Sequence, residues 1–183
     1  MHKLAAMLAI VSGPALASGI EIQVDGQYTQ GTITIDLYED VAPNHVAQIT
    51  QLAEDGFYDN VYFHRVIDGF MAQTGDGRFG KVSANALQRA GTGGSDLPNI
   101  KAEFSDRSFD RGIVGMARSQ SPDSANSQFF IMFAEGHFLN GNYTVVGEVT
   151  GGLDVLDMIK RGDNSTFQVT GEPDVMAKVT VID

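Results

Sequence analysis

Residues 63–76 read Phe63-His64-Arg65-Val66-Ile67-Asp68-Gly69-Phe70-Met71-Ala72-Gln73-Thr74-Gly75-Asp76, and this stretch decides the fold. Its β-branched and aromatic residues predict two short strands. The Asp68-Gly69 dipeptide between the two runs predicts a turn that joins them. The stretch is therefore expected to form a small hairpin at the centre of the chain.

Chemically different side chains are expected to converge on one face of this hairpin. Side chains alternate along a strand, so Phe63, Arg65 and Ile67 should share one face of the first strand. Met71 and Gln73 should likewise share one face of the second. A guanidinium, a thioether and an amide would then form one patch. On composition alone, the same residues also fit an ordinary core beside a solvated arginine.

The N-terminus has the pattern of a secretory signal peptide over residues 1–17. Met1-His2-Lys3 is a short basic region, residues 4–11 are apolar, and Ala15-Leu16-Ala17 is a small-x-small cleavage site. The apolar run is too short to span a bilayer. We therefore expect export, a mature domain over residues 18–183, and no membrane attachment after the signal is removed.

The composition of the mature chain fits one domain that needs no disulfides. Its length is sufficient to bury a core. The chain has no cysteine, so it offers no thiol nucleophile and no thiolate metal ligand. The formal net charge is −11, and loss of Lys3 makes it more negative by one. Nucleic acid and anionic membrane surfaces are therefore not expected partners.

The remaining pattern predicts many strands and two helices. Pro43 begins a helix with apolar residues every three to four positions, which ends before Gly56. A shorter helix is predicted over residues 153–160, and residues 75–99 form a long loop with one helical turn at 84–89. The predicted strands are residues 20–24, 32–37, 112–117, 127–133, 144–150 and 175–182. Strands without a βαβ rhythm predict a closed antiparallel barrel capped by two helices.

Three motifs resemble the signatures of the cyclophilins, a family of peptidyl-prolyl cis–trans isomerases. The first is the opening stretch, residues 63–76. The second joins Gly115-Met116-Ala117 to Asn126-Ser127-Gln128-Phe129-Phe130-Ile131, and the third joins Phe138-Leu139-Asn140-Gly141 to Val145-Val146-Gly147. The resemblance covers nearly the whole mature chain. It implies a mainly β fold, a closed antiparallel eight-stranded cyclophilin-like barrel capped by two α-helices.

The resemblance also implies an active-site groove for proline-containing polypeptides, with no cofactor and no metal. Arg65 and Gln73 would be the catalytic residues. The residues expected to bind the substrate are Phe70, Met71, Ala117, Arg118, Gln128, Phe130, Phe138, Leu139 and Tyr143. Within the second motif, Phe129 and Ile131 alternate to the opposite face and are expected in the interior.

Three positions depart from the pattern of many eukaryotic cyclophilins. Phe138 stands where they have Trp, Tyr143 where they have His, and Arg118-Ser119 where they have Asn-Ala. Bacterial periplasmic members are similar to this chain at these positions, which together with the signal peptide predicts a periplasmic protein. A phenyl ring lacks the indole N–H donor, so weak cyclosporin binding is expected. The family resemblance and the negative charge favour a monomer.

The expected reaction needs no nucleophile, because no bond is broken. Rotation about an X-Pro amide is slow because the C–N bond has partial double-bond character, with a barrier of roughly 18–20 kcal/mol. In the twisted amide the prolyl nitrogen regains a lone pair. Arg65 can donate a hydrogen bond to that nitrogen in the twisted state alone, which is differential binding of the transition state.

The sequence leaves one alternative open, a module that binds proline-containing segments as a chaperone or scaffold without significant catalysis. An intact Arg65 favours the enzyme over this module.

A hydrolase is disfavoured, because no histidine is spaced to a Gly-x-Ser-x-Gly element. The scattered histidines and carboxylates also lack metal-ligand spacing. Gly91-Thr92-Gly93-Gly94 is not followed by the Lys-Ser/Thr of a phosphate-binding loop.

Overall fold

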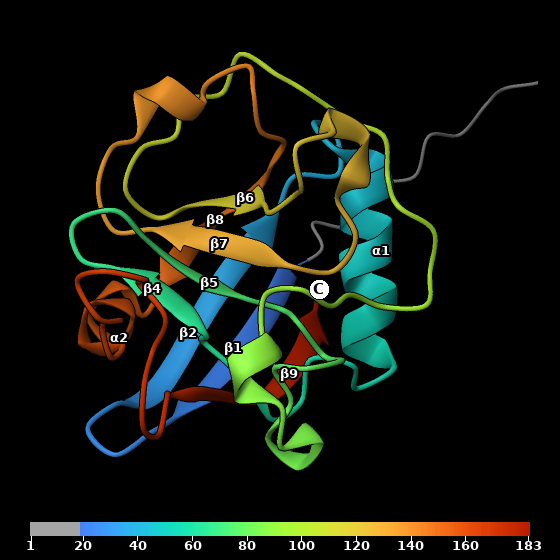
Figure 1. Ribbon diagram of the computed structural model, residues 1–183. Coiled ribbons are helices and arrows are strands. Elements are labelled where there is room, and N and C mark those ends of the chain that lie inside the picture. Colours follow the sequence, from blue (N-terminus) through green and yellow to red (C-terminus); the bar gives the residue numbers. More distant parts are fainter. Residues whose placement is uncertain (1–18) are drawn as a thin grey trace, which may run out of the picture.

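Nine β-strands form one curled antiparallel sheet in the computed structural model, which describes residues 19–183 (Figure 1). The predicted signal peptide, residues 1–17, lies outside the described residues. The strands are β1 (Gly19–Asp25), β2 (Gln30–Leu37), β3 (Val61–Tyr62), β4 (Arg65–Ile67), β5 (Met71–Thr74), β6 (Ile113–Met116), β7 (Phe129–Met132), β8 (Val145–Gly151) and β9 (Val175–Ile182). Two α-helices, α1 (Pro43–Glu54) and α2 (Leu153–Met158), and four short 3₁₀ turns complete the described fold.

The sheet is not closed, so the prediction of a closed eight-stranded barrel is wrong. The strand order is β3-β9-β1-β2-β8-β6-β7-β5-β4, which leaves β3 and β4 as the two edges of a curled half-barrel. A loop, residues 162–168, covers the outer edge of β4 in place of a strand. Val66 N donates to Phe167 O at 3.0 Å, and Gly162 N donates to Val66 O at 2.8 Å. The mainly β class with two helices is confirmed.

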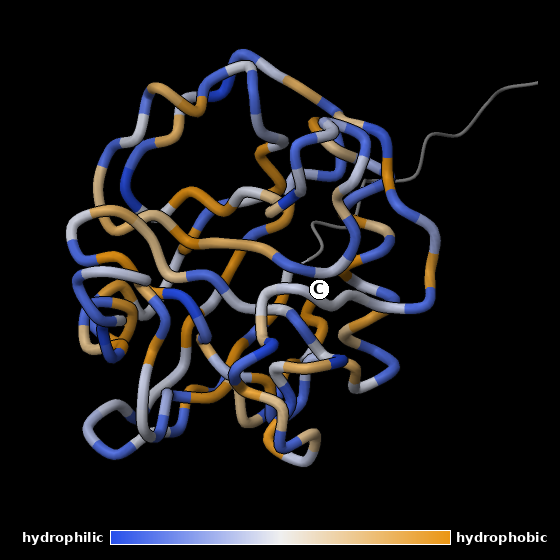
Figure 2. The backbone as a smooth tube through the Cα atoms, in the orientation of Figure 1, coloured by the Kyte–Doolittle hydropathy of each residue, from blue (hydrophilic) through white to orange (hydrophobic). Residues whose placement is uncertain are grey.

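The first two strands show how alternating hydrophobic residues form this sheet. Alternate residues of β1 and β2 are buried, and Ile22 pairs directly with Ile33 across the two strands. One face of the pair therefore lies in the core. Many of the hydrophobic segments in Figure 2 lie on the strands around this core.

The helices lie on opposite sides of the curled sheet (Figure 1). The predicted helix at Pro43 is confirmed as α1, which buries Val46, Ile49, Leu52 and Ala53. Its N-terminus is held by Glu103 from a distant loop, which accepts the backbone N–H of His45 at 3.1 Å. No helix among residues 19–183 is long and apolar enough to cross a membrane.

Strand β7 separates two apolar clusters. Phe129 and Ile131 point into the main core between the sheet and α1, as predicted. Phe130 and Met132 point to the other face, where they pack in a second cluster with Met71, Leu139 and other residues. The outer face of β7 and β5 is therefore an apolar floor, and this floor supports the candidate site.

One part of the predicted hairpin geometry is wrong. Phe63 does not share a face with Arg65 but is fully buried in the main core with Val66. The alternation is interrupted because the chain leaves β3 at Tyr62 and enters β4 only at Arg65. Phe63 N donates to Asp174 O at 2.9 Å, whereas His64 N donates to Gln73 O. The prediction for Ile67, Met71 and the turn at Asp68-Gly69 is confirmed by the β4–β5 register.

Truncation of Phe129 tests the inner core. Phe129 is 1% exposed, and its ring packs edge-on against Tyr58 with centroids 5.6 Å apart. We expect Phe129→Ala to lower the free energy of unfolding by about 3–5 kcal/mol, measured by urea titration, because the substitution leaves a cavity. Tyr28 is 80% exposed, so Tyr28→Ala should stay within about 0.5 kcal/mol of the parent. A loss below about 1 kcal/mol for Phe129→Ala would contradict the assigned core.

Candidate active site

A cavity of about 150 Å³ opens on the outer face of the sheet, above the floor formed by β5 and β7. Nine of the predicted site residues line this cavity. They are Arg65, Phe70, Met71, Gln73, Ala117, Arg118, Phe130, Leu139 and Tyr143. Residues from five separate segments of the sequence therefore meet at one place.

The floor of the cavity is apolar and closely packed. Met71, Phe130 and Leu139 are buried. The ring of Tyr143 meets Phe130 edge-on, with centroids 5.9 Å apart. Such a pocket favours a compact apolar ring and gives it little freedom to move.

One wall of the cavity is polar, and the β4–β5 register builds it. Arg65 pairs with Gln73 across the two strands, and Arg65 Nη1 donates to Gln73 Oε1 at 3.4 Å. Gln73 Nε2 donates to Gln128 Oε1 at 2.9 Å, and Gln128 Nε2 donates to Gly93 O at 2.7 Å. We call these hydrogen bonds from Gly93 to Arg65 the amide chain. It holds the guanidinium at the edge of the apolar floor.

The charge of Arg65 is not neutralised by a carboxylate within residues 19–183, since none of their ion pairs includes it. The side chain is half-buried, and desolvation lowers its pKa from the ordinary value. A guanidinium nevertheless stays protonated in proteins. The site therefore presents a fixed cation with N–H groups available to an acceptor.

Two predicted site residues lie outside this cavity. Phe138 is 71% exposed and packs on the rim, with its ring centroid 5.4 Å from that of Phe70. Gln128 lines a larger neighbouring cavity of about 490 Å³. The two cavities share Gln73, Ala117 and Arg118, so they adjoin each other, and we refer to them together as the groove.

Arg118 forms the boundary between the two cavities. Its Nη2 donates to Asn142 O at 2.8 Å, and its guanidinium lies 4.3 Å from the centroid of the Tyr143 ring. These contacts fix a side chain that would otherwise be free to move. The backbone near Arg118 is also held, because Ala117 N donates to Gln128 O at 2.9 Å.

Phe167 is a site residue that the sequence did not indicate. The Arg65 Cζ atom lies 5.9 Å from the centroid of its ring, on the loop that covers β4. Its φ of 60° is in the left-handed region, where a bulky residue is strained. The local sequence does not predict this contact, because an aromatic residue in a polar loop could equally be an ordinary exposed side chain.

His64 lies behind the polar wall and is fully buried. Neither ring nitrogen has a hydrogen-bond partner among the described residues. Burial lowers the pKa of His64 to about 4. The imidazole is therefore neutral at pH 7 and adds no charge beside Arg65. The described residues also contain no cluster of three acidic or histidine side chains that could hold a metal ion.

The geometry combines an apolar pocket with the Arg65 guanidinium at its edge, and comparison with known proteins identifies the family of the chain. The family model for cyclophilin type peptidyl-prolyl cis-trans isomerase/CLD matches residues 20–181. The chain belongs to the cyclophilin family. A Brucella suis protein named "Probable peptidyl-prolyl cis-trans isomerase" is 54% identical over 152 residues, which are 82% of this chain and 78% of the relative. A peptidyl-prolyl cis-trans isomerase of Acinetobacter baylyi is 35% identical over 164 residues, covering 86% and 80%.

Solved cyclophilin structures share the fold. Cyclophilin AquaCyp293 from Hirschia baltica matches with a TM-score of 0.71 and 25% identity, covering 88% of this chain and 73% of that chain. A Cryptosporidium parvum cyclophilin type peptidyl-prolyl cis-trans isomerase, crystallised in the presence of the dipeptide Ala-Pro, matches with a TM-score of 0.73 and 25% identity. That match covers 90% of this chain and 99% of the other. The family assignment makes this cyclophilin an enzyme of the peptidyl-prolyl isomerase class.

His64 gives this cyclophilin a measurable dependence of stability on pH. The unfolded chain protonates this imidazole near its ordinary pKa of about 6.5, whereas the folded chain does so only near pH 4. The unfolded state thus binds more protons between these values. The free energy of unfolding should fall as the pH drops below about 6.5, and the His64 contribution to this loss should reach about 3 kcal/mol at pH 4.

Urea titrations over this pH range measure the effect, with His64→Leu as the comparison. Leucine fills the site without a titratable group, so the variant should lose this part of the pH slope. Its stability at pH 7 should stay close to that of the parent, because both ring nitrogens lack partners. Equal pH slopes for the two proteins would show that His64 does not titrate as expected.

Proposed function

We propose that this cyclophilin accelerates rotation about X-Pro bonds in folding or exported proteins, and that Arg65 stabilises the twisted amide. The observation that supports the proposal is the position of the Arg65 guanidinium. It is half-buried, lacks a carboxylate partner among residues 19–183, and borders an apolar pocket of about 150 Å³. The Cryptosporidium parvum relative studied with Ala-Pro is consistent with a prolyl ligand in this pocket.

In the proposed mechanism, the pocket holds the proline ring while the preceding residue rotates. Phe70, Met71 and Phe130 would contact the ring, and Gln73 would orient Arg65. The planar amide nitrogen has no lone pair to offer, because resonance delocalises it. As the bond twists, the nitrogen becomes an acceptor and Arg65 donates to it. The hydrogen bond therefore forms in the transition state and not in the ground state.

The required acceleration is within the reach of positioning and one strong hydrogen bond. Uncatalysed isomerisation takes tens of seconds, so a millisecond turnover needs roughly 4 to 5 decades, or about 6–7 kcal/mol. Fixing the proline in a pocket lowers the entropic part of the barrier. A charge-assisted donor in a partly dehydrated site contributes the rest.

Substitution of Arg65 tests the catalytic proposal against the binding-module alternative. We expect Arg65→Ala to lower kcat/KM for a short Ala-Pro-Phe-type peptide by about 100- to 1000-fold, with peptide affinity nearly unchanged. Arg65→Lys should recover little activity, since an ammonium lacks the rigid guanidinium fork. The measurement is the cis-to-trans rate at low temperature, together with calorimetric peptide binding.

Arg107→Ala is the matched control for this experiment. Arg107 also lies over an aromatic ring, with its Cζ 4.4 Å from the centroid of Tyr38, but it lines neither cavity of the groove. Its substitution should leave the rate unchanged. If Arg65→Ala keeps the parental rate, the catalytic role of Arg65 is wrong. If the parent binds peptide without accelerating isomerisation, the groove is a recognition site.

Export is the part of the proposal that rests on residues 1–17. We expect the protein recovered from the periplasm of an expressing Gram-negative host to begin at Ser18, as measured by intact mass. Ala17→Arg should block processing, because the cleavage site requires small residues. Recovery of the unprocessed chain in the cytoplasmic fraction alone would contradict periplasmic action.

Two further properties follow from the same proposal. Phe138 offers no donor at the rim of the groove, so cyclosporin should bind weakly. The active species should be a monomer, because a large negative net charge opposes the association of identical chains.

A further inference from the structure

Asp76 closes the central stretch of the sequence, and the proposed mechanism gives it no task. The residue is fully buried, with 0% of its surface exposed. No ion pair among residues 19–183 includes it. The neighbouring His64 is neutral at pH 7 because burial lowers its pKa to about 4. A buried, uncompensated carboxylate is costly and requires other partners.

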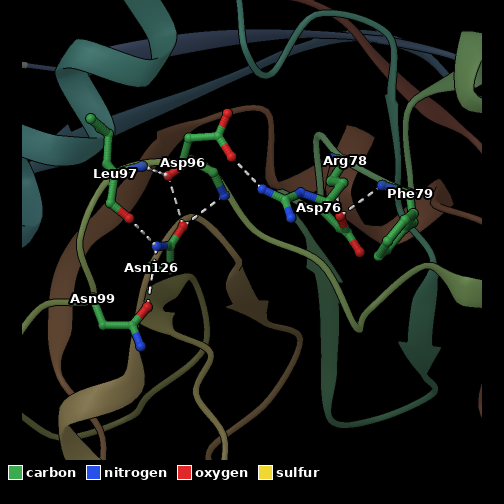
Figure 3. A network of polar contacts seen from close by, with 8 residues as sticks. Asp76, Arg78, Phe79, Asp96, Leu97, Asn99 and Asn126 are labelled. Atoms are coloured by element: carbon green, nitrogen blue, oxygen red, sulfur yellow. Dashed lines mark hydrogen bonds and ion pairs between the residues drawn. The ribbon is translucent and has the colours of Figure 1, made fainter.

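Four backbone N–H groups supply those partners. Asp76 Oδ1 accepts from Arg78 N at 3.1 Å and from Phe79 N at 3.0 Å. Asp76 Oδ2 accepts from Gly91 N at 2.8 Å and from Gly93 N at 2.9 Å. One carboxylate thus ties together two points of the long loop that are separated by more than ten residues. Figure 3 shows the carboxylate beside the backbone of Arg78 and Phe79.

Gly93 connects this carboxylate to the amide chain. Its N–H donates to Asp76, while its carbonyl accepts Gln128 Nε2 at 2.7 Å. A carbonyl only accepts, so the amide of Gln128 must turn its nitrogen toward Gly93 and its oxygen toward Gln73. Gln73 must then donate to Gln128, which leaves its own oxygen facing Arg65. The Gly93 carbonyl, which only accepts, and the Arg65 guanidinium, which only donates, therefore require the same direction for every hydrogen bond between them.

The close approach of Gly93 to Asp76 depends on the absence of a side chain. A Cβ built on Gly93 would collide with Asp76 Oδ1 and with the Phe79 ring. The same position thus has to be glycine for the carboxylate to reach its N–H. Asp76 and Gly93 form one unit, although a long loop separates them in the sequence.

We propose that Asp76 is a positioning residue for Arg65, acting through Gly93, Gln128 and Gln73. This inference rests on the proposed catalytic role of Arg65. The carboxylate holds the Gly93 carbonyl at the end of the amide chain, and the chain orients Gln73 Oε1 toward the guanidinium. Asp76 touches no substrate.

Substitution by Asn tests the proposal. An amide keeps the size of the carboxylate but turns an N–H₂ group toward one pair of backbone donors, so that end of the loop is released. We expect Asp76→Asn to lower kcat about 10- to 100-fold, with KM changed by less than about twofold. The apolar pocket that binds proline contains no atom of Asp76, so binding should persist. The amide can keep its oxygen toward Gly91 and Gly93, so a folded Asp76→Asn protein with the parental kcat overturns the proposal when a folded Gly93→Ala protein also has the parental kcat.

A double-mutant cycle separates positioning from a general structural effect. If Asp76 acts through Gln73, Asp76→Asn should cost less than about twofold in kcat when Gln73→Ala is already present. If the fold-losses in kcat of the two single variants multiply in the double variant, the amide chain does not carry the effect. A Gln73→Ala protein with the parental kcat would show the same. An Arg65→Ala protein with the parental rate would instead refute the proposed catalytic role of Arg65, and it is assayed separately.

Two more variants keep the test decisive. Asp96→Asn removes the same charge from the same loop, but its carboxylate is exposed and pairs with Arg78 instead of the backbone, so kcat should not change. Gly93→Ala displaces the carboxylate without changing the charge, and it should reproduce the loss in kcat. Gly93→Ala decides the question if thermal melting shows that Asp76→Asn is not folded. A folded Gly93→Ala protein with unchanged kcat would then refute the positioning role.

Discussion

The burial of β7 on both faces is the constraint on which the rest of the structure depends. A strand in a curled sheet usually covers a core with one face and meets water with the other. Here Phe129 and Ile131 fill the interior, while Phe130 and Met132 support a second apolar cluster outside. The outer cluster needs its own cover, and the loop and 3₁₀ turn that contain Leu139 supply part of it. The part left uncovered is the pocket, so the site arises where the fold leaves apolar surface open.

The polar wall of the site follows a second constraint, that buried polar groups need partners. The hydrogen bonds between Gly93, Gln128 and Gln73 all run in one direction. The chain ends at Arg65, whose guanidinium donates once to Gln73 and keeps other N–H groups available. Inside a partly dehydrated groove such donors interact more strongly than they do in water. The loop of residues 75–99 is thereby connected to the pocket, because Gly93 accepts the last hydrogen bond of the amide chain. The sequence predicts this segment only as a long surface loop, whereas its Gly93 carbonyl is part of the polar wall of the site.

Local patterns predicted much of this molecule, and contacts between distant residues account for the rest. The strand pair at the N-terminus, the helix at Pro43 and the closing strand β9 follow from alternation and from turn residues within short windows. The face of Phe63 could not be predicted, because its hydrogen bond to Asp174 interrupts the alternation. The contact of Glu103 with the start of α1 and the contact of Phe167 with Arg65 could not be predicted either. Each comes from a part of the sequence whose local pattern says nothing about its partner.

The open edge of the sheet connects the fold to the chemistry. An exposed edge strand invites pairing with other chains, and folded proteins cover such edges. Residues 162–168 cover β4, and two backbone hydrogen bonds to Val66 satisfy its outer side. A strand at this position would extend the regular ladder, whereas the loop follows an irregular path and brings Phe167 to the guanidinium. The strained φ at Phe167 indicates that the covering loop is held by its surroundings and not by its own preference. An unclosed barrel thus places the arginine between a regular hairpin on one side and an irregular loop on the other.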